Sequence, residues 1–173
     1  MKKISFVLPL ALLPIAALAA CSSTVTDADA ERREVRELLD HNHITALVDR
    51  IGHTLDEGAF EDFREIYTAD ASATTPGGTA QGVDAMIAQA GRNHSADQRI
   101  QHFISNVIID LQGDTAAVRA NMIATFTPVV AATLTEPKYT LGGIYEFDAV
   151  RTSQGWRLSR VQTTPHWAIG TRF

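Results

Sequence analysis

One strand-like segment, residues 98–110, places two polar side chains where they could do chemistry. β-Branched and aromatic residues dominate the segment and turn-forming residues flank it, which is typical of a β-strand. Both of its alternating residue sets are largely apolar, so we expect it to be covered on both faces. His102 and Asn106 lie in one of these sets, among isoleucines. Since burying either side chain without a partner costs roughly 1–3 kcal/mol, each needs a protein group, a water molecule or a ligand. The pattern fits either a structural histidine with satisfied hydrogen bonds or a histidine that faces a ligand.

The helices that must cover this strand precede it in the chain. An apolar stripe with helical spacing predicts a helix that has Asp40 as its N-cap and ends at Glu57-Gly58. Asp49, His53 and Asp56 follow one another at i, i+4 and i+7 beside that stripe. The other elements predicted before residue 98 are helices over 60–67 and 82–92 and a short strand around 71–74.

Three more strands are predicted after the segment, over residues 115–127, 138–152 and 156–167. The even-numbered residues of the first of these are small except for Val118, Met122 and Phe126, so we expect space beside this face of the sheet. Helices first and a curved antiparallel sheet afterwards indicate an α+β domain with the helices on one face of the sheet.

The face on which His102 lies depends on the turn that follows its strand. A two-residue hairpin at Gln112-Gly113 pairs His102 with the more polar, odd-numbered residues of the next strand. A longer loop or a β-bulge places it on the face of Met122 and Phe126 instead. The sequence leaves both alternatives open.

The N-terminal residues are predicted to target the protein rather than to fold with it. Lys2 and Lys3 precede an apolar run that is short for a membrane-spanning helix, and Leu18-Ala19-Ala20-Cys21 resembles a bacterial lipobox. We therefore expect Cys21 to be lipidated, and the protein to be anchored on the periplasmic or extracytoplasmic side of a bacterial membrane. An ordinary cleaved signal peptide with a chance cysteine is the alternative. The expected organisation is a lipoprotein signal peptide (1–20), a tether (21–33) and one domain (34–173).

Charge and composition argue against several classes of partner and cofactor. Cleavage after residue 20 leaves 13 Lys+Arg against 20 Asp+Glu, a net charge of −7, which disfavours nucleic-acid binding. The single cysteine allows no intrachain disulfide and no cysteine metal site. His41 and His43 point to different helix faces, so we expect no metal, and no motif indicates a cofactor. His94 lies in a polar loop and His166 follows Pro165 near the C-terminus, and both are expected to be solvated.

Seven short motifs occur in an order that points to one family. They are Leu55-Asp56-Glu57-Gly58-Ala59-Phe60, Tyr67-Thr68-Ala69-Asp70-Ala71, Gln81-Gly82-Val83-Asp84-Ala85-Met86, Gln101-His102-Phe103, Gly113-Asp114-Thr115-Ala116, Gly143-Ile144-Tyr145 and Gly155-Trp156-Arg157. This order resembles the SnoaL-like domain of the NTF2-like superfamily, which includes scytalone dehydratase, ketosteroid isomerase and bile-acid 7α-dehydratase. The resemblance covers roughly residues 34–170. It implies a cone-shaped, curved antiparallel sheet with three helices packed on its concave face.

The resemblance also implies a pair of functional residues. Asp56 and His102 match the positions of an aspartate and a histidine that act together in the dehydratase branch. Such a carboxylate orients the imidazole, which can take a proton alpha to a carbonyl or give one to a departing hydroxyl. This chain departs from that branch at Leu55, near which dehydratases carry a tyrosine, and at Phe126, close to their second pocket histidine. The expected ligand pocket comprises Tyr67, Asn106, Met122, Phe126, Tyr145 and Trp167.

Three functions remain open at this point. The first is a cofactor-independent lyase or isomerase, a dehydratase for instance, that acts on a small, mostly apolar hydroxy-carbonyl compound of steroid-like or polyketide-like type. The second is an envelope lipoprotein that binds an apolar small molecule in the same pocket without chemistry. The third is a structural module that forms a homodimer through the outer face of the sheet.

Overall fold

The structure, a computed structural model, describes residues 19–131 and 133–173. The predicted signal peptide lies almost wholly outside these residues. For Cys21 the structure describes the backbone and not the side chain. The chain divides into two compact units between Glu37 and Leu38. Everything described below from Leu38 onward belongs to the second unit.

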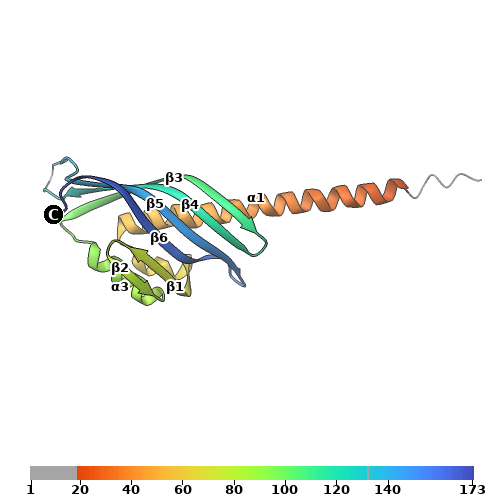
Figure 1. Cartoon of the computed structure of the whole chain (residues 1–173), viewed down its shortest axis with the longest axis horizontal. Coiled ribbons are helices and arrows are strands. Elements are labelled where there is room, and N and C mark those ends of the chain that lie inside the picture. The colour runs from red at the N-terminus through yellow and green to blue at the C-terminus, as the bar shows by residue number, and fades with distance from the viewer. Residues whose placement is uncertain (1–18, 132) are drawn as a thin grey trace, which may run out of the picture. The chain divides into compact units, whose positions relative to one another are not determined.

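The described residues form three α-helices, and α1 is the longest. It runs from Ala19 to Glu57, and α2 (Phe63–Ile66) and α3 (Val83–Asn93) are short (Figure 1). A 3-10 turn, η1 (Phe60–Asp62), leads into α2. The residues expected to form the tether are part of α1. No helix in the described part of the chain is long and apolar enough to cross a membrane.

Six strands form one curved, unclosed sheet in the order β2-β1-β6-β5-β4-β3 (Figure 1). Their bounds are β1 (Tyr67–Thr75), β2 (Gly78–Gln81), β3 (Gln98–Gln112), β4 (Thr115–Pro128), β5 (Tyr139–Thr152) and β6 (Gly155–Gly170). The predicted α+β class is confirmed. The sheet is mixed rather than purely antiparallel, because β1 lies parallel to β6. Strands joined by a hairpin must be antiparallel. β1 and β6 are separated in sequence by the other strands, so they can pair in parallel.

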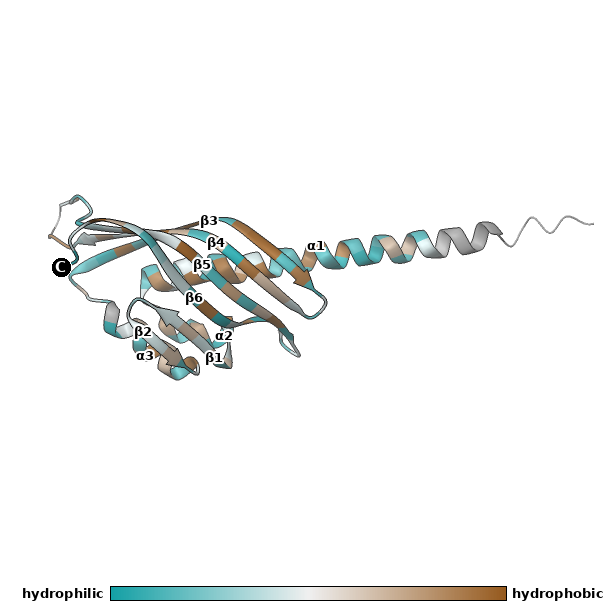
Figure 2. Cartoon of the chain, viewed as in Figure 1, coloured by the Kyte–Doolittle hydropathy of each residue, from teal (hydrophilic) through white to brown (hydrophobic). Residues whose placement is uncertain are grey.

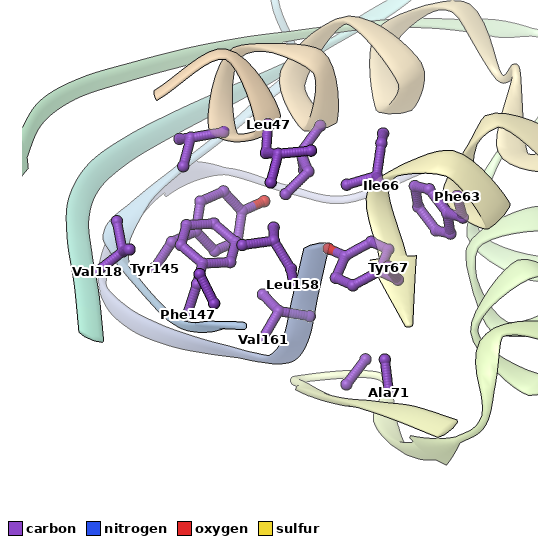
Figure 3. Close-up of a cluster of buried hydrophobic side chains, with 14 of the residues drawn as sticks. Leu47, Phe63, Ile66, Tyr67, Ala71, Val118, Tyr145, Phe147, Leu158 and Val161 are labelled. Carbon is purple, nitrogen blue, oxygen red and sulfur yellow. The ribbon is translucent and has the colours of Figure 1, made fainter. Parts of the chain in front are cut away.

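The apolar stripe of α1 packs on the sheet to form a single core. Ile44, Leu47, Val48 and Ile51 are all buried and recur at helical spacing. Figure 3 shows Leu47 above a cluster of side chains from β4, β5 and β6. Figure 2 shows hydrophobic and hydrophilic residues interspersed along α1 and the strands. In β4, buried and less buried residues alternate, because one face of this strand is covered by the core and the other is not.

Asp40 is not an N-cap, contrary to the sequence prediction, since α1 continues unbroken through it. The residue is 4% exposed, and its carboxylate accepts hydrogen bonds from the indole Nε1 of Trp156 (2.9 Å) and from Arg151. Arg151 also pairs with Asp114 and lies 4.5 Å from the centre of the Trp156 ring. This polar cluster therefore fastens the middle of α1 to the β5–β6 hairpin.

A β-bulge in β3 decides which way His102 points. The hairpin after β3 is a two-residue turn that pairs Gln112 with Thr115, and the register shifts by one residue between Ser105 and Ile108. Asn106 lies in this bulge with φ of 54°, a left-handed conformation that asparagine tolerates better than most residues. Beyond the bulge His102 pairs with Ala124. The bulge alternative is thus the correct one, and His102 lies on the face of Met122 and Phe126.

Candidate functional site

Asp56 and His102 meet at the end of α1. The imidazole Nδ1 of His102 lies 2.7 Å from Oδ1 of Asp56. The backbone N–H of His102 donates to the same carboxylate, at 2.9 Å to Oδ1 and 3.1 Å to Oδ2. The side chains are 9% exposed for His102 and 21% for Asp56, so the contact is shielded from most of the solvent. The structure therefore brings together the two residues that the resemblance singled out, 46 positions apart in the chain.

Local structure explains why α1 delivers a carboxylate to this point. The helix ends in a Schellman motif: Gly58 has φ of 71°, and the N–H of Ala59 donates to the carbonyl of Thr54. Asp56 thus lies in the last helical turn, where the helix dipole disfavours negative charge. The backbone N–H of His102, which donates to both carboxylate oxygens, opposes that cost, and the ring Nδ1 contacts Oδ1 as well. This N–H is available because β3 is an edge strand, with one row of backbone groups unpaired.

Gly52 allows the close approach of α1 to β3. It lies one turn before Asp56, and a Cβ at this position would stand 3.4 Å from the Cδ1 of Ile104 and 3.8 Å from the Cβ of His102. A methyl group would just make contact, and a longer side chain would push the helix away from the strand. A residue without a side chain here keeps the carboxylate within reach of the imidazole.

His102 also faces a cavity with a volume of about 180 Å³. A void of about 150 Å³ is enough to hold benzene, so this one suits a small ring system. Apolar side chains make up most of its wall, and it is partly open to solvent. Its lining includes Ile51, Leu55, Phe60, Phe63, Tyr67, Ala73, Met86, Ile100, His102, Met122, Ala124, Phe126, Leu141, Tyr145 and Val161.

Two buried tyrosines supply polar groups to this apolar wall. Tyr67 and Tyr145 are 4% and 5% exposed, and Figure 3 shows both among the buried side chains. Burial raises the pKa of each hydroxyl well above its ordinary value, and the charge of Asp56 raises the pKa of Tyr145 further. Neither hydroxyl is hydrogen-bonded to another residue in the described ranges. Both therefore stay protonated at neutral pH and can donate to a ligand.

Two of the residues predicted to line the pocket lie away from it. Asn106 is exposed, because the bulge removes it from the regular alternation of β3. Trp167 is 45% exposed on the opposite face of the sheet, where its indole occupies the place that a side chain at Gly142 would fill. Tyr67, Met122, Phe126 and Tyr145 do line the cavity.

Two polar residues of the cavity wall, His94 and Arg172, were not predicted from the sequence. His94, which was expected to be solvated, is half-buried there, with its ring 5.4 Å from that of Phe60 in an edge-on arrangement. The absence of a side chain at Gly58 leaves room for it. Arg172 lines the cavity from the last residues of the chain. No motif marks either residue, since a loop and a terminus carry no periodicity from which orientation can be predicted.

The described residues contain no group of three His, Cys, Asp or Glu side chains placed to hold a metal ion. The cavity wall brings together an imidazole oriented by a carboxylate and two protonated tyrosine hydroxyls, in mostly apolar surroundings. A carboxylate–imidazole pair can move a proton, and the cavity can hold the molecule that gives or receives it.

Comparison with protein families identifies the family of this chain. Residues 36–162 match the model of the SnoaL-like domain, and the chain belongs to that family. A comparison with curated proteins finds no match. The matched residues cover most of the second compact unit and include both Asp56 and His102.

Solved structures share the fold. One is a protein from Novosphingobium aromaticivorans assigned as a scytalone dehydratase (19% identity, TM-score 0.68, covering 79% of this chain and 91% of that one). Another is a type 2 hexachlorocyclohexane dehydrochlorinase, LinA (15% identity, TM-score 0.68, 80% and 93% covered). A third is an NTF2-like protein with a cystatin-like fold from Novosphingobium aromaticivorans (24% identity, TM-score 0.62, 87% and 90% covered). These neighbours confirm the predicted NTF2-like fold.

Proposed function

We propose that this protein is a cofactor-independent lyase or isomerase that acts on a small, mostly apolar hydroxy-carbonyl compound. The observation that carries the proposal is the 2.7 Å contact between Asp56 and His102 at the wall of an apolar cavity. An ionised Asp56 accepts the Nδ1 proton of a neutral imidazole, which leaves the lone pair on Nε2. The SnoaL-like family and the fold shared with proteins named as a dehydratase and a dehydrochlorinase agree with elimination chemistry.

Dehydration follows from this arrangement in two proton transfers. Nε2 of His102 takes a proton from the carbon alpha to the substrate carbonyl, and Asp56 stabilises the imidazolium that forms. The electron pair of the broken C–H bond becomes the new carbon–carbon double bond as the β-hydroxyl group leaves. The imidazolium returns its proton to that hydroxyl, so the products are an enone and water, and His102 is neutral again. Returning the proton to a different carbon gives isomerisation.

Tyr67 and Tyr145 are the proposed donors to the carbonyl oxygen. Negative charge develops on that oxygen as the alpha proton leaves, and a neutral hydroxyl placed against it stabilises the transition state. Burial keeps both hydroxyls protonated, and the carboxylate beside Tyr145 makes its ionisation still less favourable. The cavity volume of about 180 Å³ favours a substrate with one or two rings over an enclosed steroid.

The proposal is tested by turnover with a panel of cyclic β-hydroxy ketones, followed by the ultraviolet absorbance of the enone. Asp56→Asn and His102→Gln should each lower turnover by roughly 10²–10⁴-fold, since that is the usual worth of acid–base catalysis. The double variant should be little worse than either single one, because the two residues act as a unit. Asp49→Asn and His53→Gln change exposed residues of the same helix and serve as controls.

One observation favours a second function, non-catalytic binding of an apolar molecule. The carboxylate of Asp56 also accepts the backbone N–H of His102, a contact that fixes an edge strand whether or not any reaction occurs. If binding alone is the function, the panel shows saturable binding and no turnover in any variant. Turnover that survives both substitutions contradicts the catalytic role of the pair.

A further inference from the structure

Arg172 is the only residue with a permanent charge among the described residues that line the cavity. The remaining lining side chains are apolar, hydroxyl, amide or imidazole groups. No ion pair joins Arg172 to an acidic side chain in the described part of the chain. An exposed cation beside an apolar cavity, in a chain with a net charge of −5, is well placed to attract an anionic ligand group.

The chain holds Arg172 in this position by its backbone. Gly170 has φ of 83°, and a Cβ there would stand 2.0 Å from the carbonyl oxygen of Lys138, so the turn needs glycine. The N–H of Thr171 then donates to the same carbonyl at 3.0 Å. The guanidinium carbon of Arg172 consequently lies 5.3 Å from the centre of the Phe126 ring. This aromatic face supports the cation and leaves its N–H groups available.

Strand register gives the separation between His102 and Phe126, the residue whose ring lies beside the cation. His102 pairs with Ala124, and Phe126 lies two residues further along β4 on the same face. Two residues of a strand span about 7 Å. A molecule that reaches from Phe126 to His102 therefore has its ends several bonds apart, which a ring bearing a short side chain achieves.

We infer that the substrate of the proposed reaction carries a carboxylate group, which binds Arg172 at the mouth of the cavity while the reacting carbon faces His102. This inference rests on the proposed function and names its substrate class: an apolar hydroxy-carbonyl compound that is also an acid. The planar guanidinium matches a carboxylate with two parallel hydrogen bonds. Arg172 is accordingly a residue that determines specificity and takes no part in proton transfer.

Binding without reaction tests the inference. The probes are a cyclic keto acid that lacks a β-hydroxyl group and its methyl ester, titrated calorimetrically into the purified full chain. Neither can lose water, so the measurement is independent of catalysis. The acid should bind about tenfold more tightly than the ester, as expected for a hydrogen-bonded charged pair, and this preference should shrink with added salt.

Variants locate the preference. Arg172→Gln should abolish it while leaving binding of the ester unchanged, and Arg172→Lys should retain part of it. Arg119→Gln removes the same charge from an exposed position of β4 and should leave the preference intact. Equal binding of acid and ester, or a preference that survives Arg172→Gln, overturns the inference and leaves the proposed function standing. An Arg172-dependent preference in a protein without turnover supports an acidic ligand bound at Arg172 and contradicts the catalytic proposal.

Discussion

Two aspartates of the same helix, Asp40 and Asp56, lie in different surroundings, and only Asp56 is proposed to take part in proton transfer. Asp40 is held by Arg151 and by the indole of Trp156, and it does not line the cavity that His102 faces. Asp56 is held by an imidazole that does face a cavity. A carboxylate paired with a permanent cation keeps its charge fixed, whereas one paired with histidine can share in a proton transfer near neutral pH.

The structural role of Asp40 predicts a pH-dependent stability. The hydrogen bond from Arg151 lowers the pKa of this carboxyl group against the opposing effect of burial, and Trp156 adds to the lowering. A depressed pKa stabilises the folded state above the unfolded pKa of about 3.9, and the stabilisation is lost as pH falls through the folded value. Asp40→Asn should therefore have a lower free energy of unfolding at pH 7 and a flatter decline below about pH 4.

Denaturant unfolding followed by circular dichroism between pH 7 and pH 2.5 measures this difference. Asp49→Asn removes an exposed carboxylate from the same helix and should track the unsubstituted protein. Parallel pH profiles for Asp40→Asn and the unsubstituted protein would show that Asp40 contributes nothing through its charge.

Elements were predictable from the sequence where a periodic pattern specifies them. The strand at 98–110 and those after it were assigned within a few residues, because turn residues and β-branched residues bound them. The bulge in β3 was not specified, because both alternating sets of that strand are apolar and so do not reveal a one-residue shift. The parallel β1–β6 contact, the Asp40 cluster and Arg172 depend on residues distant in sequence, which local patterns do not report.

The left-handed conformation of Asn106 makes the bulge testable. A β-branched residue is strained in this region by about 1–2 kcal/mol, and glycine is not. Asn106→Val should therefore lower the free energy of unfolding by about that amount, and Asn106→Gly should leave it nearly unchanged. Thermal unfolding of both variants provides the comparison. Equal destabilisation by valine and glycine would mean that the side chain of Asn106, and not its backbone conformation, matters at the bulge.

At the scale of the whole molecule, the outer face of the sheet offers an apolar surface. Phe103, Ile123 and Trp167 lie in one row across β3, β4 and β6, through the register that pairs Ile123 with Gly142 and Gly142 with Trp167. Their exposed fractions are 52%, 38% and 45%. We propose that this row forms an isologous contact with a second copy of the chain, as the sequence led us to expect.

Light scattering after gel filtration tests the dimer. The purified protein should elute as a dimer, and Phe103→Lys should elute as a monomer with unchanged circular dichroism, because a charge is then buried at the centre of the contact. Ile108→Lys changes an exposed residue farther along β3, beyond the bulge, and serves as the control. A monomeric unsubstituted protein at high concentration rules the contact out.

The lipobox-like motif leads to a proposal about location: Cys21 is acylated and anchors the chain to a membrane of the bacterial envelope. Cys21→Ser should then abolish incorporation of radiolabelled palmitate and release the protein from the membrane fraction, because a polypeptide without acyl chains has no anchor. Cleavage of the unsubstituted protein without any lipid label would contradict the proposal.

Hydrogen–deuterium exchange at the carbon alpha to a carbonyl tests most directly whether His102 removes a proton. A cyclic keto acid without a β-hydroxyl group is incubated with the protein in deuterium oxide, and its alpha protons are followed by NMR. The unsubstituted protein should speed the exchange, and His102→Gln and Asp56→Asn should slow it by roughly 100-fold or more while still binding the compound. Exchange at the same rate with the unsubstituted protein and with His102→Gln would show that this imidazole removes no proton.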